Sequence, residues 1–185
     1  MSPLRSETPA RMKVVEDDIT QLDVDAIVNA ANTRLTPGGG VSGAIHRAAG
    51  PELWEECRKV GPCPTGDARI TGGHRLRARH VIHTVGPRWH GGASGEDALL
   101  ASAYRRSLEL ARDHGLKSVA FPAISTGIYG FPPERAAAIA VRTVAAFLEK
   151  NPLPGTVIFC CFGRDSAELH RRAMAALEAD SRKAE

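Results

Sequence analysis

The sequence predicts a single three-layer α/β/α domain around a central mixed, mostly parallel sheet. Short apolar runs alternate with longer helix-compatible segments along the 185 residues, which is typical of strands joined by helical crossovers. The run Val119-Ala120-Phe121 is apolar throughout, as in strands that helices cover on both faces. No internal repeat and no linker divides the chain, so one domain is expected.

Each element is predicted from its own pattern. Strands are expected at residues 13–16, 26–29, 68–71, 80–85, 118–122 and 156–162. The third and fourth runs follow each other closely, which indicates an antiparallel or mixed pair. Helices are expected at residues 43–60, 96–114, 133–150 and 166–179, with Pro133 near a start and Gly115 just after an end. The domain is expected to span residues 11–180, with residues 1–10 and 181–185 as flexible ends.

Composition narrows the class of partner. Hydrophobic residues make up 43%, and the net charge of +3 comes from 24 Lys+Arg against 21 Asp+Glu. The basic residues are scattered, so a solvated surface is favoured and nucleic acid is only a weakly supported partner. No apolar run approaches bilayer length and the first residues lack a signal-peptide core, so we expect a monomeric cytoplasmic protein without membrane contact.

The four cysteines do not have the spacing of a metal site. Cys57 and Cys63 form one isolated pair, while Cys160 and Cys161 lie inside an apolar strand-like run, where cysteine behaves as a small hydrophobe. Structural zinc normally needs two paired half-sites. We therefore expect no metal and no other cofactor.

Two glycine-rich loops follow apolar strands. The first contains Gly38-Gly39-Gly40 ahead of a helix, where free backbone N–H groups favour an anion such as phosphate. The second contains Ser125-Thr126-Gly127-Ile128-Tyr129, which offers hydroxyls, a bare N–H group and an aromatic face. Neither has the P-loop or the dinucleotide-fold pattern. Together they predict a clamp for a pyrophosphate-linked nucleotide, and the alternative is a pair of turns that bind nothing.

Three further features have both a functional and a structural interpretation. Asp18, at the end of the first strand, can accept from a purine amine or cap a turn. Phe162, at the end of the last strand, can stack on a base or fill the core. The histidines at positions 46, 80 and 83 are favoured as hydrogen-bonded structural residues over catalysts.

Several blocks in a fixed order carry a family resemblance. They are Val24-Asp25-Ala26-Ile27-Val28-Asn29-Ala30-Ala31-Asn32, Gly38-Gly39-Gly40-Val41, Gly43-Ala44-Ile45-His46-Arg47-Ala48-Ala49-Gly50, Cys63-Pro64-Thr65-Gly66, His83-Thr84-Val85-Gly86-Pro87 and Phe121-Pro122-Ala123-Ile124-Ser125-Thr126-Gly127. The chain resembles a macrodomain, in particular the bacterial ADP-ribosyl hydrolases and O-acetyl-ADP-ribose deacetylases related to the MacroD proteins. The resemblance covers residues 13 to about 176.

The resemblance implies an ADP-ribose site and assigns its parts. Asp18 would bind the adenine amine, Ile19 would add a backbone contact, and Phe162 would stack on adenine. Asn32 would bond the distal ribose, while Gly40 and Val41 would line the diphosphate and that ribose. The other side would be closed by Ser125, Thr126, Gly127, Ile128 and Tyr129.

Ser42 departs from the family pattern. Hydrolytic members usually have aspartate here, thought to position or activate a water, and a serine hydroxyl is no general base by itself. Three interpretations follow. The substrate phosphate can supply the base while Asn32 and Ser42 position the water; the protein can be a reader that binds without cleaving; or Ser42 can be a deliberate replacement of aspartate. The resemblance favours hydrolysis of ADP-ribose esters on acidic side chains of ADP-ribosylated proteins and of O-acetyl-ADP-ribose, with the reader as the alternative.

Overall fold

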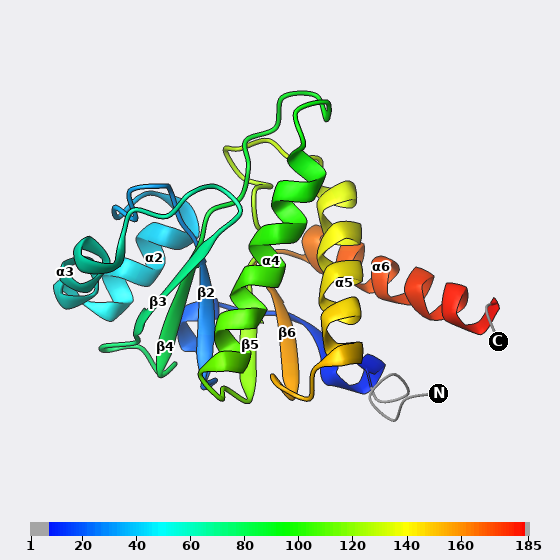
Figure 1. The fold of residues 1–185 in the computed structure, drawn as a ribbon, viewed down its shortest axis with the longest axis horizontal. Helices are drawn as coiled ribbons and strands as arrows, with labels where there is room; N and C mark the ends of the chain where they lie inside the picture. The colour runs from blue at the N-terminus through cyan, green and yellow to red at the C-terminus, as the bar shows by residue number, and fades with distance from the viewer. Residues whose placement is uncertain (1–7, 184–185) are drawn as a thin grey trace.

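The computed structural model describes residues 8–183, which form one six-stranded sheet in the order β1-β6-β5-β2-β4-β3 (Figure 1). The strands are β1 (Met12–Glu16), β2 (Ala26–Ala30), β3 (Ala68–Gly72), β4 (His80–Thr84), β5 (Ser118–Phe121) and β6 (Thr156–Cys161). Only β3 and β4 pair antiparallel, and every other neighbouring pair is parallel. The prediction of a mixed, mostly parallel sheet is confirmed.

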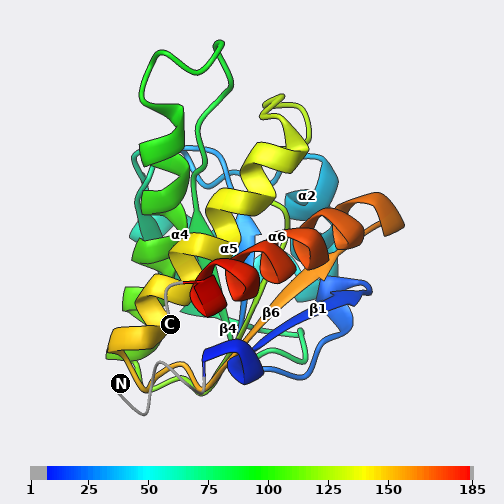
Figure 2. The same cartoon turned by 90° about the vertical axis from the view of Figure 1, so that its right-hand side faces the viewer.

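Helices cover both faces of the sheet, which gives the three predicted layers. The helices are α2 (Gly40–Ala49), α3 (Pro51–Val60), α4 (Glu96–Asp113), α5 (Pro133–Lys150) and α6 (Arg164–Lys183), with short 3-10 turns η1 (Thr8–Arg11) and η2 (Ile19–Gln21). One face carries α2 and α3, and the other carries α4, α5 and α6 (Figures 1 and 2).

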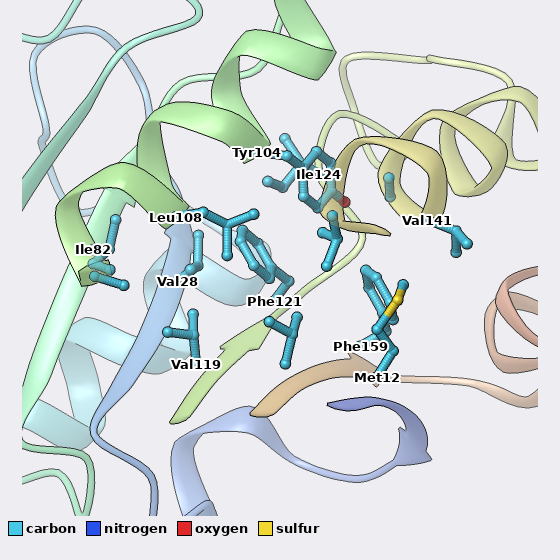
Figure 3. Packing of buried hydrophobic residues seen from close by; sticks show 14 of the residues in the cluster. Met12, Val28, Ile82, Tyr104, Leu108, Val119, Phe121, Ile124, Val141 and Phe159 are labelled. Carbon is cyan, nitrogen blue, oxygen red and sulfur yellow. The ribbon is translucent and has the colours of Figure 1, made fainter. Parts of the chain in front are cut away.

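Successive strand residues enter the two cores in turn, because side chains along a strand alternate between faces. Val28 and Ile82 belong to the core under α4 and α5, whereas Ile27 and Val81 belong to the core under α2 and α3. Figure 3 shows the first of these cores, where the ring of Phe121 packs among the strand side chains. Burial on both faces explains why these strands are apolar without alternation.

Two helices were predicted with the wrong boundaries. The segment predicted as one helix at 43–60 begins at Gly40 and is broken at Gly50, whose φ of +88° ends α2 before Pro51 starts α3. Glycine tolerates this conformation and proline suits a first helical turn, so the break is local in origin. The last helix begins at Arg164 and continues to Lys183, beyond the predicted end at residue 179.

The Arg11 side chain, at the end of η1, is hydrogen-bonded to the end of α5 and to the segment that follows it. Its guanidinium donates to the carbonyl oxygens of Leu148 at 2.8 Å, Asn151 at 2.8 Å and Pro154 at 2.7 Å. These bonds satisfy carbonyls at a helix end that lack an intrahelical partner. They lie at the amino edge of the parallel strands, opposite the loops described next (Figure 2).

Candidate functional site

The predicted ligand loops meet at one edge of the sheet. The strands β1, β6, β5, β2 and β4 are mutually parallel, so the segments that follow them leave from the same side. The loops after β2, β4 and β5 lie together at the upper end of Figure 1. In open α/β sheets ligands bind at this carboxyl edge.

One end of this edge is suited to binding a nucleobase. The Asp18 Oδ1 atom accepts from the backbone N of Thr20 at 2.9 Å and from its hydroxyl at 2.7 Å, which confirms the capping interpretation. Ile19, in the η2 turn that this cap starts, is buried. Within residues 8–183, Asp18 Oδ2 makes no hydrogen bond and remains an acceptor for a ligand amine.

Phe162 projects into solvent just after β6 and is 98% exposed, so the core-packing alternative is excluded. Ile128, in the loop after β5, is equally exposed. These two are the large hydrophobic side chains that residues 8–183 leave exposed, and both belong to the predicted site. An exposed ring beside glycine-rich loops offers a stacking surface for a base.

The first glycine-rich loop leads directly into α2. Gly39 precedes the helix without a side-chain cap, and Gly40 has a φ of +55°. A Cβ atom built on Gly38, Gly39 or Gly40 would meet nothing within 4 Å, so open space lies over the loop. Val41 follows in the first helical turn and is half-buried. The uncapped N–H groups and the helix dipole together favour a phosphate here.

Asn32 shapes this loop through its own hydrogen bonds. Its Oδ1 accepts from the backbone N of Arg34 and of Thr36, both at 3.1 Å, and its Nδ2 donates to the Thr36 hydroxyl at 2.7 Å. The amide is thus engaged within residues 32–36. Its predicted bond to the distal ribose stays a prediction, and it requires the amide to share one of these contacts.

The second loop is closed by internal hydrogen bonds. The Ser125 carbonyl accepts from Phe131 N at 2.9 Å, the Gly127 carbonyl accepts from Gly130 N at 3.0 Å, and the Thr126 hydroxyl donates to a backbone carbonyl at 3.3 Å. Ser125 itself has a φ of +68°. These contacts present Gly127 and Ile128 at the exposed tip, where the prediction places the diphosphate.

A third loop, after β4, supports the second and was missed by the sequence analysis. The Arg88 guanidinium lies 5.0 Å from the centre of the Tyr129 ring, and Trp89 N donates to the Tyr129 carbonyl at 2.8 Å. A Cβ on Gly86 would lie 2.1 Å from Ser125 Oγ and 2.5 Å from Ile124 Cγ2, so any larger residue would displace these side chains. The block from His83 to Pro87 was recognised as a motif, but its contact with residues 125–129 depends on the strand order.

Glu96 holds the same loop in shape. It is 1% exposed and accepts from the backbone N atoms of His90 at 2.9 Å, Gly92 at 2.9 Å and Ser94 at 2.6 Å. These hydrogen bonds, the one from His90 first, lower the pKa of Glu96 to about 2. A carboxylate that accepts several N–H bonds stays charged, and it fixes the backbone that donates them.

Ser42 lies in the first turn of α2, 7% exposed, and accepts a hydrogen bond from Asn29 Nδ2 at 3.5 Å. Within residues 8–183 no hydrogen bond joins Ser42 to His46, whose pKa is lowered by burial. A serine nucleophile needs an adjacent base, so Ser42 has none of the usual activation. His83 is fully buried and hydrogen-bonded, as the structural interpretation predicted.

Among residues 8–183 no cluster of three His, Cys, Asp or Glu side chains has the arrangement of a metal site. The four cysteines are free and buried, and burial raises the pKa of the Cys57 thiol to about 12 and that of Cys63 to about 11. Thiols in this state are weak ligands and weak nucleophiles. No helix of the described chain has the length and apolar composition to cross a bilayer.

Comparisons with known proteins agree with this geometry. The Macro domain family model matches residues 28–140. A Macro domain-containing protein of Methanosarcina mazei is 60% identical over 164 residues, which cover 89% of this chain and 88% of that protein. An O-acetyl-ADP-ribose deacetylase of Escherichia fergusonii is 56% identical over 169 residues, covering 89% of this chain and 96% of the relative.

A solved structure gives the same result for the fold. The Trypanosoma brucei macrodomain in complex with ADP-ribose superimposes with a TM-score of 0.83 at 42% identity, covering 88% of this chain and 68% of that one. The segment that the Macro domain family model matches runs from β2 into α5 and so contains both glycine-rich loops. The chain belongs to the macrodomain family.

Proposed function

We propose that this protein binds ADP-ribose along the carboxyl edge of its sheet. Adenine would lie between Asp18 Oδ2 and the Phe162 ring, and the diphosphate would lie between the two glycine-rich loops. The observation that carries the proposal is the presence, on one edge, of an exposed ring, a free carboxylate oxygen and an uncapped helix start. The ADP-ribose complex of the related trypanosomal macrodomain supports the choice of ligand.

The reaction proposed is hydrolysis of ADP-ribose esters. Water would add across the ester bond of O-acetyl-ADP-ribose, or of ADP-ribose carried on an acidic side chain of a protein, and give ADP-ribose and a free carboxylic acid. Relatives named O-acetyl-ADP-ribose deacetylase at 56% identity support this class. The chain offers no carboxylate at position 42, so a phosphate oxygen of the substrate would take the proton of the attacking water.

A reader that binds ADP-ribose without cleaving it is the second candidate, and Ser42 is the observation in its favour. A positioned carboxylate base contributes typically about 10²–10⁴-fold to a rate, and Ser42 cannot supply that contribution. Binding needs no general base, since neither stacking on the Phe162 ring nor phosphate binding by the glycine-rich loops involves proton abstraction.

Two measurements test these proposals in order. Calorimetry with free ADP-ribose tests binding, and absence of heat at high micromolar ligand would contradict both candidates. A release assay with glutamate-ADP-ribosylated protein and O-acetyl-ADP-ribose then separates enzyme from reader. Turnover above the rate without protein, abolished by Gly40→Glu, would support the enzyme; binding without turnover would support the reader.

A further inference from the structure

A chain of buried polar side chains runs from Ser42 into the sheet. Asn29 Nδ2 lies 3.5 Å from Ser42 Oγ and 3.2 Å from His83 Nδ1, and His83 Nε2 lies 2.9 Å from Thr71 Oγ1. Asn29, Thr71 and His83 are at most 2% exposed, and they come from β2, β3 and β4. No part of the proposed hydrolysis uses these three side chains.

The orientation of the Asn29 amide fixes the direction of the hydrogen bonds in this chain, because Nδ2 carries two protons and no lone pair and so donates to His83 Nδ1. The Thr71 hydroxyl has two backbone carbonyls as acceptors, those of Gly72 at 3.2 Å and Val81 at 3.5 Å. Because Nδ1 accepts, a neutral His83 ring carries its proton on Nε2 and donates it to Thr71 Oγ1, and the Thr71 proton is then directed to these carbonyls. The Cys57 sulfur, 3.7 Å from Nε2, is a second and weaker acceptor for the Nε2 proton.

The remaining protons follow from that first step. Burial lowers the pKa of His83 to about 3, so the ring is neutral and carries one proton. Its Nδ1 accepts from one N–H of the Asn29 amide, which leaves the single ring proton on Nε2. The second N–H of the same amide then points at Ser42 Oγ. Asn29 therefore donates to Ser42.

Within residues 8–183 this is the one hydrogen bond that Ser42 Oγ makes, so the hydroxyl proton has no internal acceptor. We propose that Asn29, His83 and Thr71 act as positioning residues that hold Ser42 as a hydrogen-bond donor toward an acceptor oxygen of the bound ligand. The inference rests on the proposed ADP-ribose site for the identity of that ligand. In this arrangement Ser42 donates a hydrogen bond to the ligand, whereas a carboxylate at position 42 would accept one.

The amide of Asn29 also leaves its Oδ1 atom buried without a partner, and the buried Nδ1 of neighbouring His46 is likewise unpaired. The His46 and His83 rings lie 6.4 Å apart between their centroids, so both atoms belong to the same cluster. Buried polar atoms are satisfied in most proteins, commonly by ordered water.

The first experiment needs no ligand. In protein labelled with ¹⁵N-histidine, the two ring nitrogens of His83 can be assigned by long-range ¹H–¹⁵N correlation at pH 7. The expected spectrum has a protonated Nε2 and an unprotonated Nδ1. Thr71→Val, which removes the acceptor at Nε2, should shift the population toward protonated Nδ1. Thr84→Val is the matched control, because Thr84 is equally buried and donates to backbone carbonyls outside this cluster. A protonated Nδ1 in the unmodified protein would overturn the proposal.

The second experiment measures affinity for ADP-ribose in a double-mutant cycle. Asn29→Asp replaces the donor by an acceptor of the same shape, so the Ser42 hydroxyl should donate to residue 29 and no longer to the ligand. A lost hydrogen bond to a charged oxygen corresponds to about a tenfold to hundredfold loss of affinity. We expect that loss for Asn29→Asp and for Ser42→Ala, with no further loss when both are combined.

Thr71→Val should give a smaller loss that likewise disappears in the Ser42→Ala background, which keeps the test available if Asn29→Asp does not fold. Equal losses with and without Ser42 would overturn the proposal, and so would a Ser42→Ala variant with unchanged affinity. If the unmodified protein does not bind ADP-ribose, the proposed function fails, whereas the His83 spectrum still decides the direction of the hydrogen bonds.

Discussion

Phe162→Ala should weaken ADP-ribose binding without weakening the fold. Stacking of a base on an aromatic side chain contributes about 1–3 kcal/mol, which corresponds to about a 5- to 150-fold loss of affinity. The ring is 98% exposed in the free protein, so its removal uncovers no buried surface. The free energy of unfolding should therefore change by less than about 0.5 kcal/mol.

Calorimetry with ADP-ribose, AMP and ribose 5-phosphate gives the critical comparison. The loss should appear for the two ligands that contain adenine and be absent for ribose 5-phosphate. Phe162→Tyr is the matched control, because it keeps the aromatic face and should bind within about twofold of the unmodified protein. A loss below about twofold for ADP-ribose, or an equal loss for ribose 5-phosphate, would refute the stacking assignment.

Three further predictions concern Ser42, Gly43 and Glu96. Ser42→Asp should raise release of glutamate-linked ADP-ribose by about 10²–10⁴-fold in an initial-rate assay, whereas the uncharged Ser42→Asn should not; equal rates would argue against a missing base. Gly43→Ala should lower the Tm by about 2–12 °C, because its Cβ would lie 2.4 Å from the Gly38 carbonyl, while Gly38→Ala meets nothing within 4 Å and should leave the Tm unchanged. Glu96→Gln should be less stable than the unmodified protein in urea at pH 7. Because the folded-state pKa of Glu96 is lowered from 4.5 to about 2, the gap should close as pH falls from about 4.5 toward 2, and a gap that persists at pH 2 would contradict this.

The strands and their order of appearance were predictable because their signal is local. All six strands fall within two residues of their predicted bounds, since each apolar run fills a buried strand. The break between α2 and α3 was not predicted, although Gly50-Pro51 is a strong stop and start signal. The spacing of apolar residues stays helical across the break, so the pattern alone does not reveal it.

The site was predictable in part, for a different reason. The glycine-rich loops can be recognised from the sequence, whereas the exposure of Phe162 cannot. Phe159, three residues earlier, is 1% exposed, and the contrast depends on where β6 ends. Asn29 and His83 are 54 positions apart, and their contact arises because β2 and β4 are neighbours in register. Such a pair cannot be read from one sequence without knowing the strand order.

The hydrogen bonds of Arg11 have a practical consequence for the use of this domain as a capture reagent. They hold η1 against the end of α5, at the amino edge of the sheet, while the proposed ligand loops occupy the opposite edge (Figure 2). A tether joined to the chain at Thr8 would therefore be attached at the edge of the sheet that lies opposite these loops. Immobilised in that orientation, the domain would present its loops to ADP-ribosylated peptides in solution, with the solid support on the far side.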